Sequence, residues 1–266
     1  MKRTTAVFAA CAMVLSSSAL LARVHPFGDA GLVAAASTQP PNQTLLLEHS
    51  SAPPEARTLL TEKCADCHSM QTKSHFYGRF APVSWLMERD IVEGRKAMNL
   101  SQWDRYSADQ QQTLTAKMVQ ESKAHEMPLL QYRMIHWDAR ITEDDVKTLS
   151  AWSHAIPQAA TGTASTSAGA GDAARGKEVF EKRCTGCHSL TEDREGPRLQ
   201  GLYGRTSGAV AGFSYSPALL KAKIVWNDQT LDQWLTDPDA MIPGNNMDFQ
   251  VVKPQERKDL IAYFKH

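Results

Sequence analysis

The stretch Cys184-Thr-Gly-Cys187-His188 decides how this sequence is interpreted. In a C-x-x-C-H pentad the two thiols add across the vinyl groups of a haem, and the histidine that follows reaches the iron as an axial ligand. Two intervening residues let both sulfurs meet one edge of the porphyrin. The same pentad occurs earlier as Cys64-Ala-Asp-Cys67-His68. The repeat of the whole pattern predicts a protein with two haem c groups. Each would be attached covalently through its two cysteines and ligated at its iron by the histidine.

Length, charge and cysteine content agree with that interpretation. The chain has 266 residues, and Cys64 and Cys184 lie 120 positions apart, which favours two small domains. With 29 basic and 29 acidic residues, net charge implies no attraction to nucleic acid or to an anionic membrane. Of five cysteines only Cys11 lies outside the pentads. A redox dithiol or half of a zinc site would not require the histidine that adjoins both cysteine pairs.

Residues 1–22 are typical of an export signal. Lys2 and Arg3 precede an apolar run from about Ala6 to Ala22. The run is slightly short of the roughly 20 residues that a spanning helix prefers, and no small-x-small cleavage site follows at once. A cleaved signal peptide and an uncleaved membrane anchor therefore both stay open. In either case we expect the body to be periplasmic, because haem c is attached outside the cytoplasm, and residues 23–54 to form a spacer.

Residues 55–157 are expected to form an all-α domain around the first haem. Pro53-Pro54 opens a helix that runs into Cys64. Ser84 is expected to cap a helix that ends near Lys96. The pairs Ser107/Gln110 and Thr142/Asp145 have the spacing of capping boxes and predict two further helices, the first of them running to about His125. Four tryptophans are expected to fill the core rather than relay electrons: Trp85, Trp103, Trp137 and Trp152.

The second axial ligand of the first haem stays open on the residues alone. Met127 is the preferred candidate, since Pro128 ends the helix and leaves the thioether at a fixed turn. The alternatives are His125, His136, His75, His154 and Met98, or an open iron.

This region resembles a family of bacterial haem-binding domains. The similarity lies in CADCHS, APVSW, GR followed by MNLSQW, and MPLLQY with His136 just beyond, before a closing helix with Trp152. The resemblance implies an exported, mostly helical haem c domain, and it also points to Met127 as the second ligand.

Residues 158–171 read QAATGTASTSAGAG, without charge and with one residue larger than threonine. Such a composition predicts a flexible linker with a root-mean-square span of roughly 20 Å. We therefore place the second domain at residues 172–266.

In that domain, a helix is expected from Ala174 to Arg183, with Gly176, Val179 and Phe180 on its buried side. Further helices are expected over residues 228–236 and from Pro254 onward, with a loop over residues 242–247 between them.

The segment is similar to the small single-haem cytochromes c that serve as electron carriers in mitochondria and bacteria. The matching stretches are GKEVF, CTGCH, GPRLQGLYGRTSG, FSYSPAL, VW, IPGNNMDF and DLIAYFK. The resemblance implies that Met247 is the second axial ligand and that the Pro197 carbonyl supports His188. It also places Arg205, Tyr215 and Trp226 near a haem propionate. The family's ring of lysines is missing: Asn246 stands where lysine is usual, and residues 172–266 carry 13 basic and 13 acidic residues, so steering toward a strongly acidic partner is not expected.

An iron held by imidazole and thioether has no vacant position for substrate. We therefore expect a di-haem electron carrier, not an enzyme, that works between a redox donor and acceptor such as a dehydrogenase, quinol complex, oxidase or peroxidase. The alternative is a di-haem peroxidase-like oxidoreductase with an open iron in the first domain. A redox or gas sensor ranks last, because the sequence shows no signalling domain.

Overall fold

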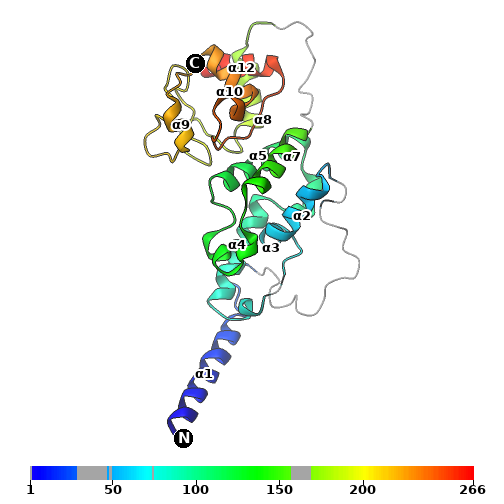
Figure 1. Cartoon of the computed structure of the whole chain (residues 1–266), viewed down its shortest axis with the longest axis vertical. Coiled ribbons are helices and arrows are strands. Elements are labelled where there is room, and N and C mark those ends of the chain that lie inside the picture. The colour runs from blue at the N-terminus through cyan, green and yellow to red at the C-terminus, as the bar shows by residue number, and fades with distance from the viewer. Residues whose placement is uncertain (1, 29–46, 48–49, 74, 157–168) are drawn as a thin grey trace. The chain divides into compact units, whose positions relative to one another are not determined.

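The computed structural model describes residues 2–28, 47, 50–73, 75–156 and 169–266 (Figure 1). Regular structure in these ranges is helical, apart from an isolated bridge between Thr206 and Val225. The predicted all-α class is confirmed. Most of the predicted spacer and residues 158–168 of the predicted linker lie outside the described residues.

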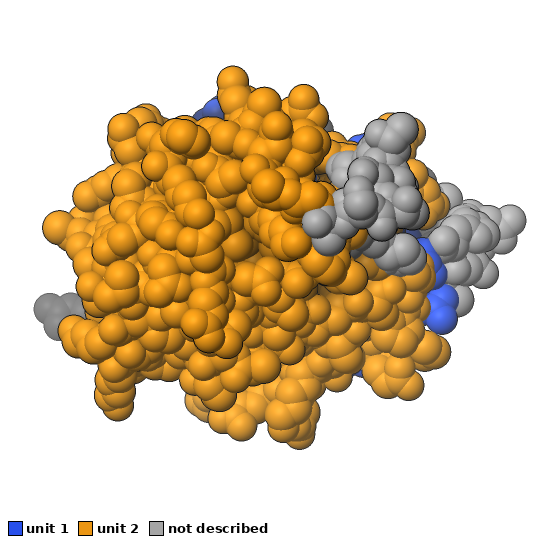
Figure 2. All heavy atoms as spheres, turned by 90° about the horizontal axis from the view of Figure 1, so that it is seen from above, with its two compact units in different colours: residues 1–50, 57–103 blue, residues 51–56, 104–266 orange. Residues whose placement is uncertain are grey.

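The chain divides into two compact units, which Figure 2 colours separately: Met1–Ser50 with Arg57–Trp103, and Ser51–Ala56 with Asp104–His266. Unit 1 contains α1 (Lys2–Leu21), most of α2 (Pro54–Lys63), α3 (Ala65–His68), the 3-10 turn η2 (Phe76–Arg79), α4 (Val83–Ala97) and most of η3 (Leu100–Arg105). No helix within the described ranges, α1 included, has the length and apolar character needed to cross a membrane.

The start of α4 differs from the prediction. The helix begins at Val83 after Pro82, two residues earlier than expected, and no side chain caps it. Ser84 is fully buried inside the first turn, so it does not cap the helix. Proline at the cap position already supplies the fixed φ angle that starts a helix, and burial takes the Ser84 hydroxyl away from the orphan N–H groups.

The first helices of unit 2 are α5 (Ala108–Lys123), α6 (Leu130–Ile135), η4 (Trp137–Ala139) and α7 (Glu143–Ala155). Both predicted capping boxes are present, at Ser107 for α5 and at Thr142 for α7. The helices α5 and α7 lie side by side (Figure 1). Of the four tryptophans, Trp103 and Trp152 are buried, whereas Trp137 is 72% exposed, so core filling was the wrong role for Trp137. Trp137 follows a six-residue helix with no buried residue, and within its own turn η4 only Ala139 is buried.

The rest of unit 2 holds α8 (Ala173–Arg183), α9 (Pro217–Ala222), α10 (Asp228–Thr236), α11 (Pro238–Met241) and α12 (Pro254–Phe264). The two terminal helices α8 and α12 pack against each other (Figure 1). Val179 and Phe180 of α8 join Leu260 and Ile261 of α12 in one buried apolar cluster. Burial of these side chains stabilises the crossing by the hydrophobic effect, at roughly 25 cal/mol per Å² of apolar surface. The crossing positions the end of α8, from which the second pentad begins.

Candidate haem sites

The second pentad is a turn that continues directly from α8. The Cys184 N–H donates to the Phe180 carbonyl at 2.9 Å and closes the last turn of the helix. The N–H groups of Cys187 and His188 then both donate to the Cys184 carbonyl, at 3.1 and 2.8 Å. Two thiols and one imidazole are therefore presented by a single tightly bonded turn.

The His188 imidazole is oriented by the backbone that follows it. Its Nδ1 donates to the Pro197 carbonyl at 2.8 Å. Because a carbonyl only accepts, Nδ1 carries the proton and Nε2 keeps the lone pair needed for a metal. The ring lies directly against Gly196, where a Cβ would lie 2.1 Å from the imidazole Cε1. Burial lowers the pKa of His188, which favours the neutral imidazole that a metal requires.

Met247 is held in a loop that Asn245 stabilises. The Met247 N–H donates to the Asn245 Oδ1 at 2.7 Å, and the Asn245 amide donates back to the Ile242 carbonyl at 2.9 Å. Asn245 is 1% exposed, so these bonds are shielded from water. Met247 packs, partly buried, against the same apolar cluster as Cys184. The sequence predicts a loop over residues 242–247, but the role of Asn245 in holding it is seen only in the structure.

Arg205 and Trp226 are brought together by the backbone: the Trp226 N–H donates to the Arg205 carbonyl at 3.0 Å. The Arg205 guanidinium donates to the carbonyls of Arg198 and Gln200. The Tyr215 hydroxyl accepts from the Val210 N–H at 3.3 Å, and burial raises the pKa of Tyr215. Contact of these side chains with a propionate stays a prediction.

The first pentad repeats the geometry of the second in unit 1. The N–H groups of Cys67 and His68 donate to the Cys64 carbonyl at 3.3 and 3.0 Å. Nδ1 of His68 lies 3.2 Å from the Met98 carbonyl, which takes the place that Pro197 has beside His188. Burial lowers the pKa of His68 as well. Met98 is a sequence candidate for its thioether, whereas the role of its carbonyl could not be predicted, because every residue type carries the same backbone acceptor.

The candidates for the second ligand of the first haem are divided between the units. His75 and Met98 belong to unit 1 with the pentad, and Met127, His125, His136 and His154 belong to unit 2. Three of the histidines have other partners: His75 binds Asp66, His136 stacks on Tyr132, and His154 binds the Asp248 carbonyl. Met127, preferred for its place before Pro128, stays a prediction.

The chemistry of the cysteines fits covalent haem attachment better than the alternatives. Burial, with the charges of Asp66 and Asp90, raises the pKa of Cys67 to about 12. Burial also raises the pKa of Cys184 to about 12 and that of Cys187 to about 11. Thiols that stay protonated are weak zinc ligands. In the described part of the chain, moreover, no group of three or more His, Cys, Asp or Glu side chains could hold a metal ion. A thioether-bonded macrocycle with a histidine ligand is the group that these residues suit.

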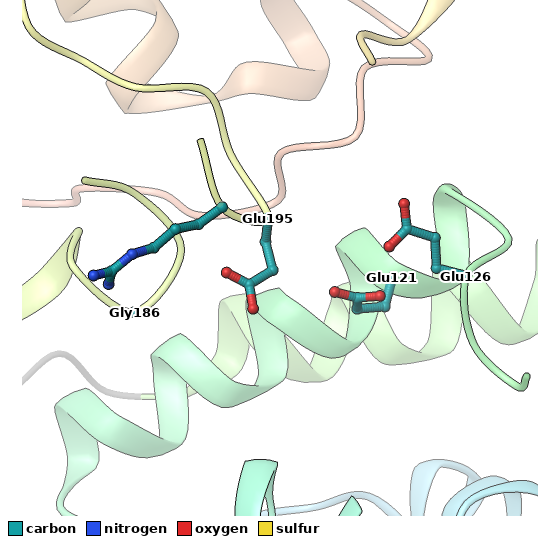
Figure 3. A pocket seen from close by; sticks show the side chains of 5 residues that line it. Glu121, Glu126, Gly186 and Glu195 are labelled. Carbon is teal, nitrogen blue, oxygen red and sulfur yellow. The ribbon is translucent and has the colours of Figure 1, made fainter. Parts of the chain in front are cut away.

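A surface hollow lies beside the second pentad (Figure 3). It is lined by Glu121, Glu126, Gly186, Arg194 and Glu195. Burial and the neighbouring Glu126 raise the pKa of Glu121 to about 7.

Comparison with known proteins agrees with both resemblances. Residues 29–155 match the family described as "Haem-binding domain", and residues 173–266 match the family "Cytochrome c". Cytochrome c of Chlamydomonas reinhardtii is 46% identical over 100 residues, which cover 36% of this chain and 89% of that protein. Cytochrome c of Euglena viridis is 47% identical over 98 residues, which cover 36% of this chain and 96% of that protein. The solved structure of cytochrome cH from Methylobacterium extorquens is 38% identical in sequence. The match spans 36% of this chain and 98% of that chain, with a TM-score of 0.35. Residues 29–155 thus match the haem-binding family, and through the domain at residues 173–266 the chain belongs to the cytochrome c family.

Proposed function

We propose that the chain is a di-haem c-type cytochrome of the periplasm that passes single electrons between redox proteins. The donor would be a dehydrogenase or quinol complex, and the acceptor an oxidase or peroxidase. One observation carries the proposal: both pentads form the same turn, and both imidazoles direct Nδ1 at a backbone carbonyl, Pro197 at 2.8 Å and Met98 at 3.2 Å. Such a partner fixes the tautomer and the orientation of a ligating histidine.

When bound, haem c supplies a one-electron iron couple. The residues of the cytochrome c region would hold it and keep water away. His188 is oriented by Pro197, and Met247 is positioned by Asn245. A histidine–methionine pair leaves no position for a substrate, which favours electron transfer over catalysis.

Intact mass of the matured chain tests the number of haems. We expect the polypeptide plus two macrocycles, and colour that acidified acetone does not extract. Cys64→Ala with Cys67→Ala should remove one macrocycle, and Cys184→Ala with Cys187→Ala the other. A wild-type chain with fewer than two would contradict the di-haem proposal.

The second candidate function is a peroxidase-like oxidoreductase with an open iron in the first domain. It is kept because the sequence leaves the second ligand of the first haem open, with Met127 as one of several candidates. Carbon monoxide binding by the reduced protein separates the two functions. The carrier predicts slow, weak binding at both haems in the wild type and rapid binding at one haem in Met127→Ala. Met134→Ala, an exposed methionine of α6, is the matched control. Rapid binding by the wild type would favour the enzyme.

A further inference from the structure

We infer that α5 and α7 form a docking surface for the face of the cytochrome c region that carries its haem residues, and that complementary charges hold the two together. All the contacts that follow lie within unit 2. They join helices of the region matched by the haem-binding family to residues 173–266.

The centre of this contact is Arg183, the last residue of α8. Its side chain has no exposed surface, and it forms ion pairs with Asp109 of α5 at 3.0 Å and with Glu256 of α12 at 3.0 Å. Gln112 of α5 accepts a further bond from its guanidinium at 3.2 Å. A buried charge needs such partners, because an uncompensated buried charge is strongly destabilising. Two of the three come from α5, so α5 is required to bury Arg183.

The pairs around this centre all join opposite charges. Lys182 binds Asp109 at 2.8 Å, Lys117 binds Glu195, and Lys123 binds Asp239 at 2.7 Å. Three separate pairs of opposite charge fix the register of the two surfaces and disfavour other partners.

The helix α7 adds contacts at one buried carboxylate. Asp248 is 2% exposed and accepts a hydrogen bond from the Ser150 hydroxyl at 2.6 Å. His154 lies 3.4 Å from the same carboxylate. Lys123 of α5 lies 3.8 Å from it as well, so Asp248 takes its polar side-chain partners from α5 and α7.

The contacts fall beside every predicted haem ligand of this region. Gly186, inside the pentad, lies against Thr113 of α5. Glu195 stands next to Gly196, which supports His188, and Asp248 directly follows Met247. The docking surface therefore covers the haem-bearing face, and a redox partner that approaches this face must displace α5 and α7. Only this last consequence rests on the function proposed above.

The contact between the docking surface and the cytochrome c region can dissociate reversibly. Its pairs are charged and several are partly exposed, with Lys182 and Asp239 about two-fifths exposed. Salt screens such pairs. The covalent connection between α7 and α8 compensates, since a short tether raises the effective concentration of the second surface to about the millimolar range.

The experiment cuts that connection in the haem-loaded full chain. A protease recognition sequence is inserted within residues 158–168, the purified protein is cleaved, and the two pieces are analysed by size-exclusion chromatography at low and high ionic strength. We expect them to elute together at low ionic strength and apart at high. Lys117→Glu should weaken the association about tenfold or more, and Glu195→Lys in the same chain should restore it.

The matched control is Lys147→Glu, which reverses a charge of α7 that pairs at 2.8 Å with Asp144 of the same helix and should leave the association unchanged. Separation at every ionic strength, or an association that survives Lys117→Glu, would overturn the docking surface. The mass of each piece reports its haem content separately. A missing haem would contradict the proposed function but would not change the conclusion drawn from the association of the two pieces.

Discussion

Gly176 of α8 lies directly against the backbone of Asp259 in α12: a Cβ at Gly176 would lie 2.0 Å from the Asp259 carbonyl oxygen. No side chain fits in that space without moving backbone. The helices α8 and α12 can approach this closely because Gly176 has no side chain. The helix α8 ends at Arg183, directly before Cys184. The helix crossing therefore sets where the second pentad begins.

Gly176→Ala should consequently destabilise the cytochrome c region. Overpacking against rigid backbone costs about 2–3 kcal/mol, because the helices must separate. Chemical denaturation followed by far-UV circular dichroism measures the loss. Ala174→Ser, exposed on the same helix, should change the free energy of unfolding by less than about 0.5 kcal/mol. Equal effects of the two substitutions would show that the crossing tolerates a methyl group.

Asp259 should make stability depend on pH in the acid range. Its burial opposes ionisation, but hydrogen bonds from Arg175, the Asp172 N–H and Gln255 outweigh burial and lower the pKa of Asp259. A lowered carboxylate pKa contributes stability that is present above the unfolded value, about 3.9, and is lost as the pH falls through the folded value.

Asp259→Asn should therefore reduce stability at neutral pH and flatten its decline below about pH 4. Because the Arg175 side chain is 53% exposed, we expect a loss of only about 1 kcal/mol. Thermal melts between neutral and acid pH measure the effect. A variant whose decline below pH 4 is as steep as that of the wild type would refute this role of Asp259.

Gly196→Ala should disturb the second haem site while leaving the helices in place. The new methyl group would meet the His188 ring, which cannot keep both its position and its bond to Pro197. We expect a smaller fraction of chains with a haem at the second pentad, read by intact mass, and an altered absorption spectrum. Glu192→Ala, exposed in the same loop, is the control. Full loading with an unchanged spectrum would contradict the close packing of His188 on Gly196.

Met247→Ala should remove the near-infrared absorption of methionine-bound ferric haem from the second site and lower its reduction potential, since a thioether favours the ferrous form. Met241→Ala changes a partly buried methionine of the same apolar cluster and should retain the band. Potentiometric titration followed by absorbance gives both readouts. A band that survives Met247→Ala would assign the ligand elsewhere.

Much of the local structure could be predicted from neighbouring residues. The capping boxes at Ser107 and Thr142 are confirmed, because a cap involves side chains and N–H groups within one turn. Ser84 failed as a cap because a tertiary contact buried it. Arg183 was foreseeable in part: it continues the spacing of Gly176 and Phe180, so it lies on the buried face of α8.

The amino-acid sequence alone specified the chemistry of the sites. Covalent attachment needs two thiols and an imidazole within five consecutive residues, and these residues can be recognised without knowledge of the fold. Tertiary structure alone decided which carbonyl supports each imidazole, that Asn245 holds the Met247 loop, and which charges of α5 meet Arg183 and Glu195. These relationships join residues far apart in the chain through backbone atoms or through charges that any exposed helix could carry. Their partners are set by the packing of whole elements, so no short stretch of residues specifies them.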